Sequence, residues 1–321
     1  MSSIAVVGSG GVGGLYGAML AAAGHEVHFL VRSAAEEIRR RGWIVESVWG
    51  DLRIDNPLVH EDVSSMPPCD YLIVALKSTE NAQLARLLPP LTHASTTAIV
   101  LQNGLHVEEA TEAAIGPGRT IGGCCFLCSN KIAPGHIRHL DYGRIELGGY
   151  AGQRADAKTS EAKVDAVAEM LAAAKVPIDV SRDLYTTRWR KLMWNIPFNG
   201  LSVALDASTT EIMADSQARQ LAEDIMREVE EAAGACGAAI DADHVARMME
   251  HTEKMVPYDS SMRLDYLAGR PMELDYIYAR PLRDAAHAGV RPRKIEMLHQ
   301  QLRFFGKRSG EQRAASDEKG K

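Results

Sequence analysis

The chain has 321 residues, 46% of them hydrophobic and 24% charged, and a formal net charge of −6. This length and composition are typical of a globular protein of two domains, and the acidic balance argues against a nucleic acid or a membrane surface as the main partner. No apolar run has transmembrane length, no basic leader precedes the first strand and five cysteines suggest no disulfide framework, so we expect a cytoplasmic protein.

The first half of the chain alternates short β-rich runs with helical patterns. The runs SIAVVG, HEVHFLV, DYLIVAL and TAIVLQNG are apolar nearly throughout, as are strands of a parallel sheet that is covered on both faces. Residues 120–149 then read as strand, turn, strand, strand. From residue 160 onward the sequence predicts helices, with Ser208 and Glu211 at capping-box spacing before the third of them: 160–174, 184–205, 211–235, 242–255, 272–288 and 293–305.

A glycine-rich turn follows the first predicted strand. In VVGSGGVGG, Gly8 permits a tight turn, Gly10 lets the backbone approach a pyrophosphate and Gly13 allows close packing of helix and strand. The turn opens an alanine-rich helix, whose N-terminus favours an anion, and a second strand ends about 20 residues later. This context predicts a dinucleotide site rather than a structural turn, and the loop comprises Gly8, Ser9, Gly10, Gly11, Val12 and Gly13.

The end of the second strand distinguishes NAD from NADP. An NAD site usually places Asp or Glu there, whereas this chain reads FLVRS, with Arg32 as a fork for a 2′-phosphate and no carboxylate to repel it. We therefore predict NADP(H), against the alternative of a solvated surface arginine. Lys77 and Asn103 follow two further strands, at the sheet edge where ligands bind in open α/β folds.

These patterns predict an α/β protein with an N-terminal Rossmann-type dinucleotide-binding domain and a C-terminal all-helical domain. We place the first domain at residues 1–175 and the second, for substrate and catalysis, at 176–306. The polar segment 307–321 is expected to be a disordered tail.

Cys125 and Cys128, with His136 and His139 downstream, invite comparison with a zinc site. Residues three apart in a strand point to opposite faces, so the two thiols would diverge. We therefore expect no metal.

One predicted helix carries an unusual polar stripe. In KLMWNIPFNGL, Lys191, Asn195 and Asn199 recur every four residues and so share one face of the helix. A solvated face normally carries Glu, Lys and Arg, whereas asparagine is a poor helix former, so the stripe favours a polar site over a solvated surface. Pro197 removes the backbone bond to Met193 and predicts a bend at this point.

With these residues assembled, the chain resembles the ketopantoate reductase (2-dehydropantoate 2-reductase) family over nearly its whole length, apart from the polar tail. The resemblance rests on GSGGVG, ALKS, QNG, KLMWNIPFNGLS and SSMRLDYLAGRPMELD, in family order. It implies that NADPH reduces 2-dehydropantoate to (R)-pantoate, a step of pantothenate biosynthesis. The site residues that it implies are Lys191 as general acid, Glu273 at the catalytic and cofactor sites, Asn103, Asn195, Asn199 and Ser261 with Lys191 at the substrate, and Lys77 and Asn103 at the cofactor. Cys128 is also expected beside the cofactor, and it departs from the family, which more often has a small residue there.

The stripe also makes chemical sense without the family. Hydride transfer to a 2-keto acid builds negative charge on the carbonyl oxygen, and a positioned lysine can protonate that oxygen or stabilise its charge. Two alternatives stay open, a reductase of another branched 2-keto acid on the same scaffold and a non-catalytic NADP(H)-sensing module. The expected partner is a small 2-keto acid, not nucleic acid or membrane. A homodimer is compatible with the sequence, which does not determine the oligomeric state.

Overall fold

The structure, a computed structural model, describes residues 1–150 and 157–319. Contacts divide the chain into two compact units, the first formed by Met1–Asn103 and Val107–Leu184 and the second by Gly104–His106 and Tyr185–Lys321. The first unit reaches Leu184, beyond the predicted boundary at residue 175, because strand β10 (Ile178–Ser181) pairs with β9 (His136–Gly149) and extends the sheet. The predicted fold class, an α/β domain followed by a helical one, is confirmed.

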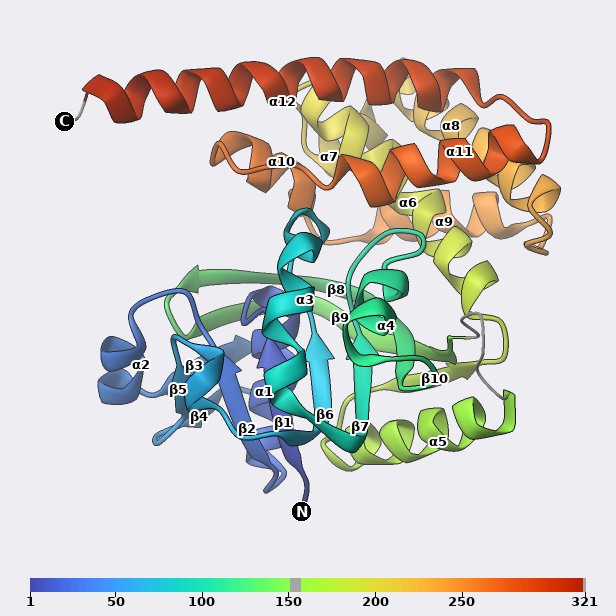
Figure 1. The fold of residues 1–321 in the computed structure, drawn as a ribbon. Coiled ribbons are helices and arrows are strands. Elements are labelled where there is room, and N and C mark those ends of the chain that lie inside the picture. The colour runs from blue at the N-terminus through green and yellow to red at the C-terminus, as the bar shows by residue number, and fades with distance from the viewer. Residues whose placement is uncertain (151–156, 320–321) are drawn as a thin grey trace. The chain divides into compact units, whose positions relative to one another are not determined.

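The described residues of the first unit contain one sheet of ten strands, in the order β4-β3-β9-β8-β7-β6-β1-β2-β5 with β10 beside β9. Its other strands are β1 (Ser3–Val7), β2 (Glu26–Leu30), β3 (Trp43–Ser47), β4 (Leu52–Ile54), β5 (Leu58–His60), β6 (Cys69–Val74), β7 (Thr92–Val100) and β8 (Thr120–Ala133). The run from β5 to β8 is parallel throughout (Figure 1). The chain leaves β1 toward β2 on one side and returns to β6 on the other. This switch in strand order marks the place where such sheets bind ligands.

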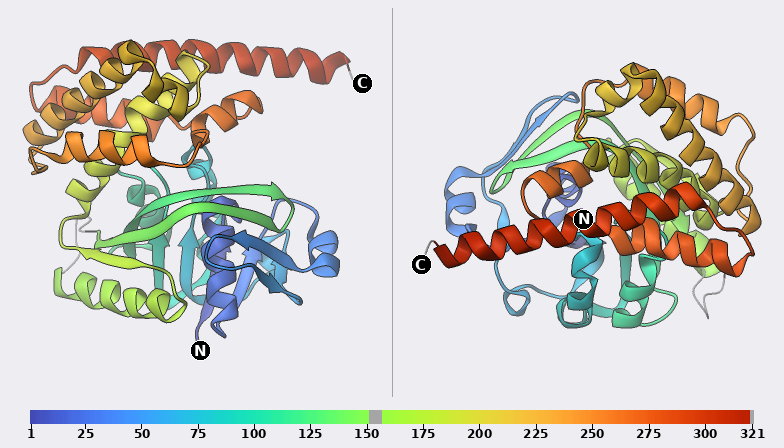
Figure 2. Two further views of the ribbon diagram at one scale, coloured as in Figure 1. Left: turned by 180° about the vertical axis from the view of Figure 1, so that it is seen from behind. Right: turned by 90° about the horizontal axis from the view of Figure 1, so that it is seen from above.

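Helices cover both faces of these parallel strands. Their bounds are α1 (Gly11–Ala22), α2 (Ala35–Arg41), α3 (Leu84–Leu87), α4 (Glu108–Ile115) and α5 (Ala157–Ala173), with 3₁₀ turns η1 (Val63–Ser65), η2 (Ser78–Gln83) and η3 (Pro89–Leu91). Figures 1 and 2 show α3 and α4 on one face and α1 on the other. Both faces are therefore covered, which explains why the parallel strands are almost continuously apolar.

Residues 120–149 differ from the predicted pattern of three strands. They form a single long antiparallel hairpin, β8 and β9, joined by a turn at Pro134 and Gly135. The pairing shifts register in three places, after Phe126, Cys128 and Lys131. Such irregularities interrupt the alternation of side chains, so a strand that bends can resemble two strands in the sequence.

The second unit is helical in the described residues. Its elements are α6 (Leu184–Ala204), α7 (Thr209–Ala214), α8 (Ser216–Ala235), α9 (His244–Lys254), α10 (Ser261–Leu267), the π-helical segment η4 (Asp275–Ala279), α11 (Arg280–His287) and α12 (Arg293–Lys319). Its hydrophobic core contains Trp189, Leu192 and Ile196 of α6 together with Ile225 of α8 and Leu298 of α12. No helix among the described residues is long and apolar enough to cross a membrane.

Several helix ends differ from the sequence prediction. The capping box of Ser208 and Glu211 is confirmed, but the predicted helix 211–235 is divided at Asp215, whose carboxylate caps α8 by accepting from the N–H groups of Gln217 and Ala218. Helix α10 was not predicted. Helix α12 continues to Lys319, so residues 307–319, expected to be disordered, are helical; residues 320–321 lie outside the described residues. A polar segment rich in helix formers can extend a helix whose nucleation has already occurred.

Candidate active site

The glycine loop lies between the end of β1 and the start of α1. Gly8 has φ +106°, and a Cβ there would lie 2.3 Å from the backbone nitrogen of Leu76 in the loop after β6. A Cβ at Gly13 would lie 2.4 Å from the carbonyl oxygen of Gly8. These two glycines are therefore required by the fold itself, because backbone atoms occupy the space that a side chain would need.

Gly10 differs from these glycines in its surroundings. A Cβ built on Gly10 would meet nothing within 4 Å among the described residues, and its φ of −89° is open to any residue. Gly10 precedes α1, and no side chain among the described residues caps the N-terminus of this helix. The loop thus leaves the helix N-terminus accessible over an open space, so its geometry fits the pyrophosphate of a dinucleotide.

Two serines hold the loop from either side. The Ser9 hydroxyl donates to the carbonyl oxygen of Leu30 at 2.8 Å, which ties the loop to the end of β2. The Ser129 hydroxyl on β8 donates to the carbonyl oxygen of Gly11 at 3.1 Å, and a Cβ on Gly11 would lie 2.4 Å from the carbonyl oxygen of Ser129. The loop is therefore held rigidly before any ligand binds. The contribution of Ser129 had no local signal in the sequence.

Arg32, just beyond β2, has a side chain that is 79% exposed and so is available to a ligand. Its Nη2 lies 3.4 Å from Oε1 of Glu80, a residue of η2. No carboxylate was expected beside this arginine from the sequence, and this prediction was wrong. Glu80 is 48 positions further along the chain, and only the parallel pairing of β1 with β2 and β6 brings the two strand ends together.

Lys77 and Asn103 follow β6 and β7, which are adjacent and parallel, so both residues lie at the predicted edge of the sheet. A buried amide braces this edge. The Nε2 atom of Gln102 donates to the carbonyl oxygen of Leu76 at 2.9 Å and to Oδ1 of Asn81 at 2.6 Å. Gln102 therefore fixes the backbone next to Lys77, a role that the sequence did not reveal.

Cys128 lies on β8 beside Ser129, and its side chain is only 3% exposed. The strand contacts the start of α1 through the hydroxyl of Ser129, whereas the thiol of Cys128 is buried. The cysteines Cys124 and Cys125 are buried as well. Within the described residues, no three His, Cys, Asp or Glu side chains are grouped so that they could hold a metal ion.

The predicted polar stripe lies on α6 of the second unit. Lys191 is half-buried, with Nζ 5.9 Å from the ring centroid of Trp194, whereas Asn195 and Asn199 are only 3% and 2% exposed. Nδ2 of Asn195 and Oδ1 of Asn199 are buried without a hydrogen-bond partner among the described residues. Buried polar atoms are nearly always satisfied. Asn195 and Asn199 thus present one donor and one acceptor without partners among the described residues, one helical turn apart, which a bound polar molecule could pair.

The backbone of α6 is modified beside these asparagines. Pro197 lies inside the helix and donates no hydrogen bond to Met193. The hydroxyl of Tyr278, which burial keeps protonated by raising its pKa well above the usual value, donates to the carbonyl oxygen of Ile196 at 2.8 Å. A Cβ on Gly200 would lie 2.6 Å from that hydroxyl oxygen, so the glycine makes room for it. Tyr278 and Gly200 were not predicted to contribute here.

Ser261 begins α10 and is partly exposed, and its neighbour Ser260 is fully buried. The Ser260 side chain accepts from the N–H of Arg263, and its Oγ lies 2.6 Å from Oγ of Ser202 on α6. The two serines thus differ in role. Ser260 caps α10 and ties it to α6, which leaves the Ser261 hydroxyl for other contacts.

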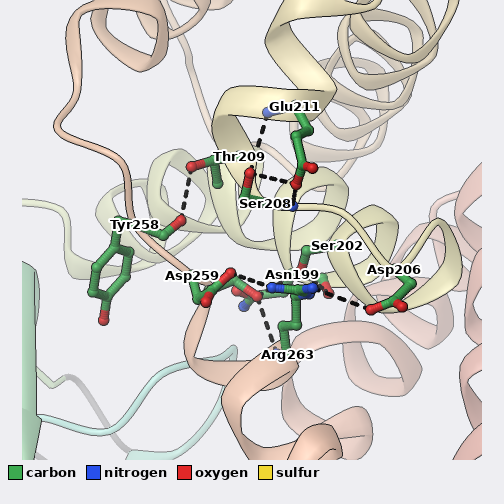
Figure 3. Close-up of polar contacts among 10 residues, drawn as sticks. Asn199, Ser202, Asp206, Ser208, Thr209, Glu211, Tyr258, Asp259 and Arg263 are labelled. Carbon is green, nitrogen blue, oxygen red and sulfur yellow. Dashed lines mark hydrogen bonds and ion pairs between the residues drawn. The ribbon is translucent and has the colours of Figure 1, made fainter.

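An arginine joins the same two helices a second time (Figure 3). The guanidinium of Arg263 contacts Asp259, which precedes α10, at 2.5 Å and Asp206, which follows α6, at 3.1 Å. Its side chain is 17% exposed. The ends of the helices that carry Asn199 and Ser261 are therefore held together by one cation and one buried pair of hydroxyl groups.

Replacing Arg263 by methionine should lower the free energy of unfolding by about 0.5–1.5 kcal/mol, because the guanidinium, whose side chain is 17% exposed, loses its contacts with Asp259 and with the exposed Asp206. Thermal or urea denaturation measures the loss. Arg219→Met is the control, since Arg219 makes an exposed pair with Glu253, and that pair should be worth less than about 0.5 kcal/mol. Equal losses in the two variants would contradict the role assigned to Arg263.

Glu273 is 4% exposed and precedes the π-helical segment η4. A short piece of the N-terminal half of the chain packs against this segment. Gly104 has φ +114°, and its Cβ would lie 2.5 Å from Cβ of Tyr276; the N–H of Leu105 donates to the carbonyl oxygen of Tyr276 at 2.8 Å. Nε2 of His106 lies 2.6 Å from Oδ2 of Asp284. Residues 104–106, which directly follow Asn103, thus belong to the second unit.

The predicted residues therefore fall into two groups. The first unit brings together the glycine loop, Arg32, Lys77 and Asn103 at one edge of its sheet, an arrangement suited to a dinucleotide. The second unit holds Lys191, Asn195 and Asn199 on one helix, with a cation next to two orphaned amide atoms. A cation and neutral amides are suited to an anionic, oxygen-rich molecule.

The chain is similar to known proteins over nearly its whole length. Residues 4–152 match the family described as Ketopantoate reductase PanE/ApbA, and residues 183–305 match its C-terminal part. The chain is 42% identical to 2-dehydropantoate 2-reductase of Nostoc sp. over 305 residues, which are 95% of each protein. The crystal structure of 2-dehydropantoate 2-reductase from Geobacter metallireducens is similar with a TM-score of 0.88 and 38% identity, covering 94% of this chain and 99% of that one.

A more distant structure extends the comparison to the fold alone. The ternary structure of D-mandelate dehydrogenase with NADH and anilino(oxo)acetate has a TM-score of 0.85 at 21% identity, covering 96% of this chain and 99% of the other.

Proposed function

Since the chain belongs to the ketopantoate reductase PanE/ApbA family of oxidoreductases, whose members use a nicotinamide cofactor, we propose that it reduces 2-dehydropantoate to pantoate with NADPH. In this proposal Lys191 is the general acid and the reaction serves pantothenate biosynthesis. The observation that carries it is the pair of buried amide atoms on α6, Nδ2 of Asn195 and Oδ1 of Asn199, which lack partners among the described residues.

The chemistry of this substrate matches the two atoms. 2-Dehydropantoate carries a carboxylate, a keto oxygen and a hydroxyl group, so it offers acceptors to the amide N–H of Asn195 and a donor to the amide oxygen of Asn199. Ser261, with a hydroxyl that does not cap α10, is proposed to bind the same molecule, and Asn103 to contribute from the end of β7. The neutral amides leave Lys191 as the cation of the stripe.

For the cofactor, we propose that the glycine loop binds the pyrophosphate and that Arg32 binds the 2′-phosphate of NADPH. The open space beside Gly10 and the 79% exposure of the Arg32 side chain support these roles. The other residues proposed to lie at the cofactor are Lys77, Asn103, Cys128 and Glu273, with Ser9, Gly11, Val12 and Gly13 of the loop. Bound NADPH supplies the hydride that is added to C2 of the keto acid.

The chain's own contribution concerns the charge that forms on the oxygen at C2. As that oxygen becomes an alkoxide, the ammonium of Lys191 stabilises it and donates a proton from Nζ, giving the alcohol. The lysine recovers its proton from solvent. The asparagines hold the carboxylate and hydroxyl oxygens, which fixes the reacting carbon in place. Glu273, buried before η4, is proposed to influence the protonation of the lysine or to position the nicotinamide ribose.

An assay of NADPH oxidation tests the proposal. The purified protein is incubated with 2-dehydropantoate and, in parallel, with branched 2-keto acids that lack its hydroxyl group, such as 2-oxoisovalerate. We expect the hydroxylated substrate to be preferred by at least about 100-fold in kcat/KM, since a buried acceptor left unpaired strongly disfavours the analogue. Preference for an unhydroxylated acid would indicate another reductase of this scaffold, and no oxidation with any acid would favour a sensing role.

Asn195→Ala and Asn199→Ala should each raise KM for 2-dehydropantoate by roughly tenfold or more, because a polar contact to the bound substrate is lost. The Kd of NADPH should change by less than about twofold. Steady-state kinetics and fluorescence titration measure the two constants. A fall in NADPH affinity without a rise in KM would assign these asparagines to the cofactor or to the fold instead.

Arg32→Asp should weaken or reverse the preference for NADPH over NADH, because a carboxylate repels the 2′-phosphate and can accept from a ribose hydroxyl. The kcat/KM ratio for the two cofactors measures this preference. Arg53→Asp reverses an exposed charge elsewhere in the same unit, beside Asp55, and should leave the ratio unchanged. A wild-type protein that used both cofactors equally would contradict the assignment of Arg32.

A further inference from the structure

The carboxylate of Glu80 occupies a defined position beside Arg32. Its Oε1 lies 3.4 Å from Nη2 of the arginine, and its side chain is 25% exposed against 79% for Arg32. The N–H of Glu80 donates to the carbonyl oxygen of Lys77 at 2.9 Å, and Nε2 of Gln83 donates to the other carboxylate oxygen. The arginine is therefore the more exposed member of the pair, and the carboxylate is held by its own turn.

Such a carboxylate affects the two nicotinamide cofactors in opposite directions. The 2′-phosphate of NADPH carries up to two negative charges, so Glu80 would both repel it and compete with it for the guanidinium. The 2′-hydroxyl of NADH is neutral and can donate to a carboxylate, as it does to the acidic residue of an NAD site. Glu80 thus opposes the selectivity that Arg32 provides.

A second cation lies close to the same arginine. Burial lowers the pKa of Lys131 on β8, and repulsion by Arg32 lowers this pKa further. Lys131 is two residues beyond Ser129, whose hydroxyl contacts the start of α1. Lys131 is therefore a cation that would favour a phosphate beside Arg32, whereas the carboxylate of Glu80 disfavours it.

We propose that Glu80 is a specificity-determining residue that lowers the selectivity for NADPH over NADH by pairing with Arg32 and opposing the 2′-phosphate. The inference rests on the proposed function, in which Arg32 binds that phosphate. The structure supports it through the ion pair with Arg32, through the fixed position of Glu80 and through its location in η2, the turn that follows β6, the strand beside β1.

Equilibrium binding of NADPH and NADH to the wild-type protein and to Glu80→Gln tests the proposal, with cofactor fluorescence as the readout. We expect the Kd of NADPH to fall roughly three- to tenfold in Glu80→Gln, while the Kd of NADH stays the same or rises. Glu80→Lys should lower the Kd of NADPH further. Glu37→Gln is the matched control, since it removes a carboxylate from the exposed pair with Arg41 in the same unit, and should change neither constant.

Adenosine 2′,5′-bisphosphate and AMP serve as probes of the 2′-phosphate alone. Binding of the bisphosphate should tighten in Glu80→Gln and binding of AMP should not, and the gain should shrink as salt is raised. An unchanged or higher Kd of NADPH in Glu80→Gln would overturn the proposal and make Glu80 either irrelevant or a support that orients Arg32. A wild-type protein that does not bind NADPH would instead contradict the proposed function, so the two failures are distinguishable.

Discussion

Lys191→Ala should lower kcat for 2-dehydropantoate reduction by on the order of 10²-fold or more, while the Kd of NADPH stays within about twofold of the wild-type value. The reason is that the ammonium interacts most strongly with the charge that develops on the substrate oxygen, so its loss affects the transition state more than the bound ground state. Rapid-mixing or steady-state kinetics and a fluorescence titration give the two quantities.

Two further variants separate catalysis from packing. Lys191→Arg keeps a cation beside Trp194 but holds its proton too tightly to donate it, so it should restore KM more than kcat. Lys254→Ala removes an exposed lysine of the same unit, paired with Glu250, and should leave kcat unchanged. If Lys191→Ala turned over at nearly the wild-type rate with an unaltered thermal melt, the lysine would be an ordinary residue of the helix surface.

Gly10→Ala should raise the Kd of NADPH by at least about tenfold without lowering the melting temperature. A methyl group at Gly10 would meet no described atom within 4 Å and its φ of −89° suits alanine, so the fold should accept it. The same methyl group would enter the space through which a pyrophosphate approaches the backbone. Titration with NADPH and differential scanning calorimetry measure the two effects.

Gly234→Ala is the matched control, because Gly234 lies within α8 and a Cβ there would likewise meet nothing within 4 Å. Alanine in a helix interior should stabilise the protein slightly and leave the Kd of NADPH unchanged. If Gly10→Ala bound NADPH as well as the wild-type protein does, the open space beside Gly10 would have no role in cofactor binding.

The sequence predicted those features of the site that depend on spacing within one element. The glycines of the loop and the stripe of Lys191, Asn195 and Asn199 belong to this class, since a turn or a helix alone determines which residues lie together. The fold class could be predicted for the same reason, because the alternation of apolar runs and helical patterns is local information.

The features that the sequence did not predict depend on distant pairs. Glu80 reaches Arg32 only because β2 and β6 flank β1, and Gln102 reaches the Leu76 carbonyl because β6 and β7 are neighbours, so that these strand ends meet at one edge of the sheet. Tyr278 likewise reaches the backbone of α6 from 82 positions away. Such contacts leave no periodicity, since each partner is compatible by itself with an ordinary turn or a core position.

Residues 104–106 belong to the second unit although they precede the rest of it in the chain, and this has a consequence for folding during synthesis. Leu105 lies in the hydrophobic core of that unit, and its N–H is satisfied by Tyr276, a residue synthesised more than 170 positions later. During translation, therefore, this leucine emerges from the ribosome well before the helices that will cover it, and the second core can close only when nearly the whole chain is available. A fragment that begins at Tyr185 would lack Leu105, so it would not contain every part of its own interior.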